Sequence, residues 1–250
     1  MCIAAAAWNA HPRWRLVVAA NRDEFHARPA APLARWDDGS GVIAGRDLKS
    51  GGTWLGVSEA GRFTLVTNYR VDGFPQPHRP SRGALVAALL GDADPAAVPI
   101  AEYNPFNLLS AAPGRALVLS NHPGESRQPM SDGVHGVSNG AFDAPWPKTQ
   151  RVTAALSGWL QSDSADFTPL FAVLRDDRPL PGPGPEPRLA SVFINNPEYG
   201  TRCSTVMAID HDGHGVISER SFDSHGNAAG EISISFTWPQ RRFHDVSQVA

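Results

Sequence analysis

The sequence predicts an α+β domain with strands at both ends of the chain and helices between them. Short apolar runs separated by turn residues occupy the first and last parts of the chain, and the middle contains a segment with helical periodicity. The 23 glycines and 22 prolines indicate frequent turns and few long helices. With 250 residues and 42% hydrophobic residues, one core is sufficient, so residues 1–250 are predicted to form a single domain.

Three pairs of apolar runs, each with turn residues in between, predict β-hairpins in the first half. The pairs are Cys2–Trp8 with Trp14–Ala20, Thr53–Ser58 with Phe63–Tyr69, and Asn107–Ala111 with Ala116–Ser120. Because the terminal strands of such a domain must pair in sheets, we expect the helices to cover those sheets.

Three helices are predicted. Ser81 precedes the helical segment Arg82–Leu90 as an N-cap, and Gly91 ends it. The clearest helix is Pro147–Ser162, because its apolar residues recur on one face of a 3.6-residue period. A third helix is predicted at Phe167–Leu174, with a proline in its first turn.

The last third of the chain returns to strands after a proline-rich loop. Every second residue from 179 to 187 is proline, so the segment from Asp176 to Leu189 is predicted to be an exposed loop. The strand-like segments that follow are Ser191–Asn195, Arg202–Asp210, Gly215–Ser221 and Glu231–Trp238. The tail from Pro239 onward is expected to be only partly ordered.

Charge and composition disfavour several functional classes. The formal net charge of −3 gives no basic field for nucleic acid and no polybasic membrane patch. The first apolar stretch, Ile3 to Trp8, is far shorter than the ~20 residues of a membrane span and has no basic segment before it. Only two cysteines occur, so a reducing compartment and a cytoplasmic location are expected.

Cys2 stands out because of its position. Removal of Met1 would make it the N-terminal residue, which then carries a thiol and an α-amine on one residue. The amine has a reference pKa of about 7.7–8.0 and can take the thiol proton, which is the arrangement of an N-terminal nucleophile. Cys203, inside an apolar run, is interpreted as a small buried hydrophobe.

A polar block, Asn21 to Glu24, follows the second apolar run. If the first two runs form an antiparallel hairpin, this block lies beside Cys2. Asp23 can then bind the Cys2 amine, and Arg22 can favour the thiolate. The alternative is a solvated turn in which Arg22 and Asp23 pair with neighbours.

Three further polar residues mark predicted strand ends. Asn68 and Asn139 are either turn formers or oxyanion-hole donors. Arg202 opens a predicted strand and is either a rim ion-pair residue or a site residue. The grouping of His211 and His214 coincides with a hairpin turn, so no metal site is predicted, and no nucleotide-binding glycine motif is present.

Ordered motifs along the chain resemble those of the NRDE proteins, the family of the Transport and Golgi organization 2 homologues. Met1–Cys2 followed by Ala20–Phe25 carries the first part of this resemblance. The further matching blocks are Gly51–Val57, Leu65–Tyr69, Ser81–Val86, Tyr103–Leu109, Gly136–Asn139 with Pro145–Lys148, and Tyr199–Arg202.

That family is similar in turn to the N-terminal nucleophile hydrolases of the choloylglycine hydrolase and penicillin V acylase type. The resemblance implies a four-layer αββα sandwich with Cys2 as nucleophile. It also implies Asp23 as a partner of the amine. The other site residues of those acylases, two asparagines and one arginine, match Asn68, Asn139 and Arg202. One departure is Ala20, which stands where those acylases commonly have an arginine, whereas Arg22 lies within the motif.

Two functional hypotheses follow. The first is an N-terminal cysteine hydrolase that cleaves a non-peptide amide (C–N) bond of a small acyl substrate through a thioester, without a cofactor. The second is a non-catalytic carrier or trafficking protein on the same fold, because eukaryotic relatives are tied to secretory-pathway organisation, lipid metabolism and haem trafficking. Its ligand would be haem or a lipid-like molecule, with His26 as a candidate haem ligand. The sequence leaves the oligomeric state open.

Overall fold

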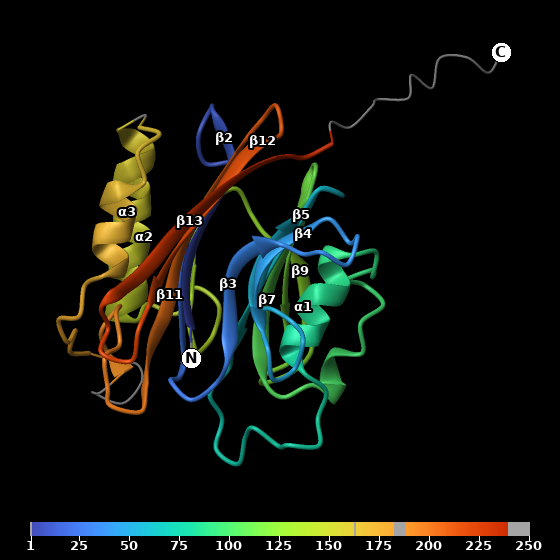
Figure 1. The fold of residues 1–250 in the computed structure, drawn as a ribbon. Coiled ribbons are helices and arrows are strands. Elements are labelled where there is room, and N and C mark those ends of the chain that lie inside the picture. The colour runs from blue at the N-terminus through green and yellow to red at the C-terminus, as the bar shows by residue number, and fades with distance from the viewer. Residues whose placement is uncertain (1, 163, 183–188, 240–250) are drawn as a thin grey trace.

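A computed structural model describes residues 2–162, 164–182 and 189–239 of the chain. Met1, most of the proline-rich loop and the tail after Pro239 lie outside these residues, and so do the predictions made for them. Two sheets pack face to face between two layers of helices (Figure 1).

Among the described residues, the strands form one six-stranded and one seven-stranded antiparallel sheet. The first sheet has the order β10 (Gly133–Val137), β1 (Cys2–Trp8), β2 (Trp14–Phe25), β11 (Tyr199–Asp210), β12 (His214–Phe222) and β13 (Ala228–Thr237). The second has the order β3 (Ala30–Arg35), β4 (Val42–Asp47), β5 (Leu55–Ser58), β6 (Arg62–Asn68), β7 (Phe106–Ala112), β8 (Arg115–Ser120) and β9 (Ser126–Pro129). The amino-terminal strand is therefore next to the edge of the first sheet.

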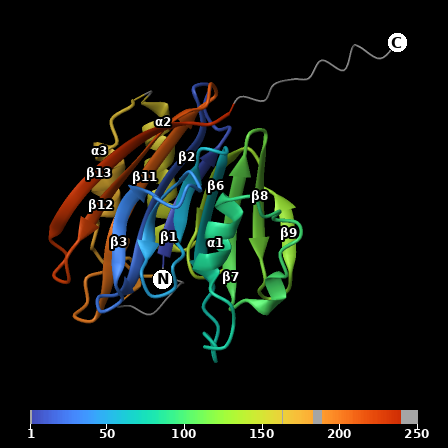
Figure 2. The same ribbon diagram turned by 45° about the vertical axis from the view of Figure 1, so that its right-hand side comes forward.

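The helices form the two outer layers. Helices α2 (Pro147–Gln161) and α3 (Thr168–Leu174) pack on the first sheet, and α1 (Arg82–Leu90) packs on the second. Figure 2 shows α1 on the side of the molecule away from α2 and α3. Within the described part of the chain, no helix has the length and apolar character needed to cross a membrane.

The expected hairpins and helices are confirmed with small changes of boundary. The side chain of Ser81 accepts a hydrogen bond from the backbone N–H of Ala84 at 3.3 Å, and Gly91 caps the other end of α1. The larger change is in β2, which continues as a strand through the polar block to Phe25 instead of turning after Ala20.

The segment Ser191–Asn195 is not a strand, so that prediction was wrong. It is a bent stretch with one isolated bridge, between Asn195 and Gly200. Val192 and Ile194 are nevertheless buried, because the segment covers the sheet face beneath α3. Apolar residues there fill a core without forming a ladder.

Strands β3, β4, β9 and β10 were not predicted from the sequence. Strands β3, β9 and β10 lie at sheet edges. Pro32 interrupts β3 beside a register shift, and Pro129 ends β9. Proline is tolerated at edges because one side of an edge strand needs no ladder bonds, and it weakens the strand pattern in the sequence.

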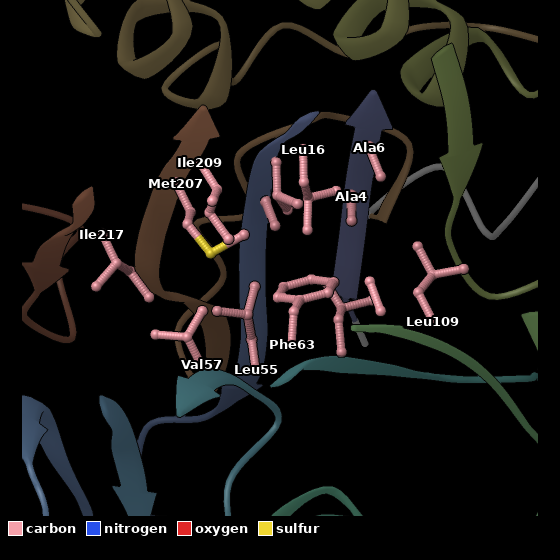
Figure 3. Close-up of a cluster of buried hydrophobic side chains, with 14 of the residues drawn as sticks. Ala4, Ala6, Leu16, Leu55, Val57, Phe63, Leu109, Met207, Ile209 and Ile217 are labelled. Carbon is pink, nitrogen blue, oxygen red and sulfur yellow. The ribbon is translucent and has the colours of Figure 1, made fainter. Parts of the chain in front are cut away.

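The inter-sheet core explains why the first apolar run lacks polar alternation. Ala4 and Ala6 face the second sheet, whereas Ile3 and Ala5 face α2 and α3, so both faces of β1 are buried. Phe63 of the second sheet lies in the inter-sheet cluster among side chains from both sheets (Figure 3). A strand buried on both faces has a continuous apolar sequence.

Candidate active site

Cys2 begins β1 and lies directly opposite Arg22 in the antiparallel ladder. Its side chain belongs to the same face as Ala4, which faces the second sheet. Cys2 is only 7% exposed, yet it lines a cavity of about 910 Å³ between the sheets. The predicted side-by-side placement of the start of the first strand and the polar block is confirmed.

Burial and nearby groups have opposing effects on the pKa of the Cys2 thiol. Burial raises the pKa of the thiol, and the nearby Asp23 carboxylate raises it further. The Arg22 guanidinium and the backbone N–H of Asp23 lower the pKa. Because burial is the largest cause, the net direction is upward, and a thiolate at this position needs a local proton acceptor.

Arg22 also lines the cavity and is 8% exposed. Its Nη2 lies 3.5 Å from Asp47 Oδ2 and 3.8 Å from Glu24 Oε2. Its Nη1 is buried and has no acceptor among the described residues. Arg22 is therefore a partly satisfied cation directly beside the nucleophile candidate.

Asp23 follows Arg22, the cross-strand partner of Cys2, and therefore lies beside the amino-terminal end of β1. Its Oδ1 accepts a hydrogen bond from the Thr201 hydroxyl at 2.7 Å, and its backbone oxygen accepts one from the Tyr199 hydroxyl at 2.7 Å. Burial raises the pKa of Asp23, while the Lys148 ammonium and the Thr201 hydrogen bond lower it. These neighbours fix the carboxyl next to the start of the chain.

Lys148 and Ser138 are site residues that sequence reasoning missed. Lys148, on the first turn of α2, is 2% exposed; burial lowers its pKa, and the negative charges of Asp23 and Cys2 raise it. Its Nζ donates to the backbone oxygen of Leu189 at 3.3 Å. The Ser138 hydroxyl donates to the backbone oxygen of Cys2 at 3.0 Å. The only sequence feature that marks Lys148 is its place at the end of the block Pro145–Lys148, which matches the family.

Asn68 and Asn139 lie in contact with each other. Asn68 ends β6 and lines the cavity. The side-chain amide of Asn139 donates to the backbone oxygen of Asn68 at 2.8 Å, and its Oδ1 lies 3.2 Å from the Ser138 hydroxyl, whose single hydrogen is shared with the shorter bond to the Cys2 backbone oxygen. One amide hydrogen of Asn139 is thus engaged in joining the turn after β10 to the end of β6.

Arg202 is brought to the cavity by a β-bulge. Thr201 pairs with Asp23 and Cys203 pairs with Arg22, so Arg202 is the extra residue between two registered pairs. Its Nη1 donates to the backbone oxygens of Phe25, His26 and Arg28 at 3.0–3.2 Å. Arg202 therefore holds the turn that follows β2, at the edge of the cavity that it lines.

The polar block forms part of the sheet and is not a solvated turn. Asn21 is fully buried, and its amide donates to the backbone oxygens of Leu174 and Val192 at 2.8 and 3.0 Å. Its Oδ1 accepts from the Ser204 hydroxyl at 2.6 Å. Asn21 thus ties the sheet to the end of α3, while Arg22 on the opposite face lines the cavity.

The residues that could hold a metal or haem are partly engaged in hydrogen bonds, although the buried His26 Nδ1 has no partner among the described residues. The His26 Nε2 lies 3.0 Å from the backbone oxygen of Asn196, so this nitrogen donates a hydrogen bond there. In the β11–β12 turn, ligand atoms of Asp210, Asp212 and His214 lie within 4.8 Å of one another. Asp210 already accepts from the backbone N–H of His214 at 2.8 Å, as expected for an exposed turn.

Solved structures with a similar fold carry the names of hydrolases. The C2A mutant of conjugated bile acid hydrolase from Clostridium perfringens matches with a TM-score of 0.56 at 10% identity, over 96% of this chain and 97% of that chain. The Caenorhabditis elegans ortholog of N-acylethanolamine-hydrolyzing acid amidase matches with a TM-score of 0.51 at 11% identity, over 82% and 92%. The chain thus has the fold of the N-terminal nucleophile hydrolases, as predicted.

Sequence relatives point to a narrower group. A Transport and Golgi organization protein 2 homolog from Bos taurus is 36% identical over 83% of this chain and 87% of the relative. The homolog from Homo sapiens is 32% identical over the same shares. The family model described as Transport and Golgi organisation 2 matches residues 1–224. The chain therefore belongs to the Transport and Golgi organisation 2 family.

Proposed function

We propose that this protein is an N-terminal cysteine hydrolase that cleaves the amide bond of a small acyl substrate. The observation that carries the proposal is the position of Cys2, at the first residue of β1 on the cavity wall, with Arg22 as its cross-strand partner and Asp23 next in sequence. The similar solved structures, one named a bile acid hydrolase and the other an acid amidase, support it.

The chemistry requires removal of Met1, so that the Cys2 amine is free. The amine takes the proton of the thiol, and the sulfur attacks the substrate carbonyl to form a C–S bond. The C–N bond then breaks, and the leaving amine receives the proton. Water attacks the resulting thioester and releases the acid and the free thiol.

Each neighbouring residue has a part in this scheme. Asp23, held by Thr201, orients the amine. Arg22 favours the thiolate, which offsets part of the effect of burial. The backbone N–H of Asn68 and the second amide hydrogen of Asn139 are the candidate donors to the oxyanion, and loss of one such donor costs about 10²–10³ in rate.

A panel of acyl amides tests this proposal. We expect turnover by the wild-type protein and none by Cys2→Ala. Cys203→Ala is the matched control, because it removes the other thiol and leaves Cys2 in place. Turnover that survives Cys2→Ala would refute the proposal.

A second candidate is a non-catalytic carrier of a lipid-like ligand. The raised pKa of the Cys2 thiol favours this alternative, because a protonated thiol is a poor nucleophile. For haem, the His26 Nε2 donates to the backbone oxygen of Asn196, whereas the buried Nδ1 has no hydrogen-bond partner among the described residues, so Nδ1 is the candidate ligand atom. A haem titration followed at the Soret band, with His26→Ala as comparison, tests specific ligation: a band shift that the substitution removes supports it.

A further inference from the structure

The cavity lined by Cys2 is richer in basic than in acidic side chains, although the whole chain has a formal net charge of −3. The acidic side chains among its described lining residues are Asp23, Glu24, Asp47 and Glu219. Seven basic residues outnumber them: Arg22, Arg28, Arg46, Lys49, Arg79, Arg82 and Arg202. The cavity wall therefore has an excess of basic residues, although acidic residues outnumber basic residues in the chain as a whole.

Two of the acidic side chains of the wall, Asp47 and Glu219, already have hydrogen-bond or ion-pair partners. Asp47 Oδ2 lies 2.6 Å from Arg28 Nε and also contacts Arg22. Glu219 accepts a hydrogen bond from the backbone N–H of Leu33 at 2.8 Å, and burial raises the pKa of its carboxyl, which favours the uncharged form. The acids of the wall consequently leave part of its positive charge uncompensated.

Arg82 is the clearest uncompensated cation. Its Nη1 donates to the backbone oxygen of Pro105 at 2.9 Å; the Glu24 carboxylate, which is shared with Arg22 and Arg28, acts on it only through its charge, and no ion pair joins Arg82 to a carboxylate of the described residues. Burial lowers the pKa of this guanidinium to about 10. Arg82 is also the first residue of α1, where the helix dipole disfavours a cation and favours an anion. An anion at this point would relieve both penalties.

The second observation is independent of the helix. Arg22, only 8% exposed and part of the same wall, has a buried Nη1 without an acceptor in the described part of the chain. The negative charge of a Cys2 thiolate raises the pKa of Arg82, so the thiol and this guanidinium lie within electrostatic range of each other. A bound anion would therefore lie near the candidate nucleophile.

The rest of the lining is partly apolar. Trp54, Val66, Pro75 and Pro77 belong to it, and Ile232 is a hydrophobic side chain with 36% of its surface exposed. A ligand that fits both parts of the wall is amphiphilic, with an anionic group and an apolar chain.

We propose that the Arg82 end of this cavity, with Arg22, binds the carboxylate or phosphate group of an acyl compound whose chain contacts the apolar wall. That the compound is an acyl amide rests on the proposed function; the anion site does not.

Isothermal titration calorimetry of the full chain with octanoate, octyl phosphate and octanol tests the site. We expect at least one anion to bind about 30-fold or more tightly than octanol, and Arg82→Gln to abolish this preference. Arg115→Gln, which removes an exposed arginine of β8, is the matched control and should retain the preference. A preference for one anion identifies it as carboxylate or phosphate.

Two results would overturn the site: equal binding of octanol and both anions, or an anion preference that persists in Arg82→Gln. If Arg82→Gln fails to fold, the wild-type preference must still weaken as NaCl rises from 50 to 300 mM, and a salt-independent preference would also overturn the site. Because none of the probes contains an amide, the outcome is independent of whether Cys2 hydrolyses acyl amides.

Discussion

Lys148 is a buried ammonium whose charge acts on both Asp23 and Cys2. Asp23 is itself buried, and burial raises its pKa, so the carboxylate depends on nearby cations to stay ionised. Lys148 is therefore a positioning residue for the amine partner in the proposed chemistry.

Replacing Lys148 with Met should raise the pKa of Asp23 further and move the acid limb of the turnover profile to higher pH. We expect turnover near pH 6 to fall by roughly tenfold, which corresponds to about 1.4 kcal/mol. Lys148→Arg keeps the charge and should restore the wild-type profile. A pH–rate profile that is the same in wild type and Lys148→Met would show that Lys148 does not act through Asp23.

Sequence reasoning found Cys2, Arg22 and Asp23 because they share one short hairpin, whose register follows from its apolar runs. Lys148 and Ser138 could not be found in this way. Each comes from a segment more than 130 residues away from Cys2 along the chain, and only the packing of α2 and β10 against β1 brings them there. The hydrogen bonds of Arg202 to three backbone oxygens depend on the β-bulge between Thr201 and Cys203, which the sequence pattern does not predict.

At the scale of elements, a hydrogen-bonded pair closes the turn that carries Ser138 and Asn139. His135 Nδ1 of β10 lies 2.8 Å from Asp143 Oδ2, and Asp143 Oδ1 accepts from the backbone N–H of Gly136 at 2.7 Å. The hydrogen bond to Asp143 raises the pKa of His135. This pair therefore holds the turn that binds the Cys2 backbone oxygen.

The pair predicts a defined pH dependence of stability. Because the folded-state pKa of His135 lies above its ordinary value of about 6.5, the stabilisation is fully present below that pH and is lost as the pH rises through the folded-state pKa. Asp143→Asn should lower the free energy of unfolding by about 1 kcal/mol at pH 5.5 and by less at pH 8.5. Urea unfolding at both pH values measures this, and an equal loss at both would count against the pair.

Most of the missed strands lie at sheet edges, although the interior strand β4 was also missed and the edge strand β13 was predicted. Strands β1 and β7, which have two partners each, have mostly apolar sequences and were predicted. Edge strands such as β9, with exposed polar residues, lack that pattern. The segment Ser191–Asn195 has a strand-like sequence because it is buried, but it has no neighbouring strand with a free edge along its length.

At the scale of the whole molecule, the two sheets contribute different parts of the site. Cys2, Arg22 and Asp23 come from the first sheet, whereas Asn68 comes from the second and Arg82 from the helix that covers it. The inter-sheet core, which includes the 1% exposed Phe63, sets their relative position. The α+β class followed from the sequence alone, but the face-to-face pairing of the sheets came from the family resemblance, since periodicity does not order strands within a sheet.

Phe63→Ala should lower the free energy of unfolding by about 3–5 kcal/mol, because it leaves a cavity between the sheets. Leu48→Ala, which truncates a side chain that is 57% exposed, should change it by no more than about 0.5 kcal/mol. Urea melts of both variants give the comparison. Similar effects for the two would contradict the assignment of Phe63 to the core that joins the sheets.

In the proposed chemistry, Cys2 becomes an N-terminal nucleophile that forms a thioester. Intact-mass spectrometry of the purified protein, acid-quenched during turnover of an acyl amide, detects both the processing of Met1 and the thioester. If Cys2 is the nucleophile, the wild-type chain lacks Met1 and carries one acyl group on Cys2, and the Cys2→Ala chain carries none. Retention of Met1, or an acyl-free wild-type chain during turnover that Cys2→Ala also performs, would contradict this chemistry.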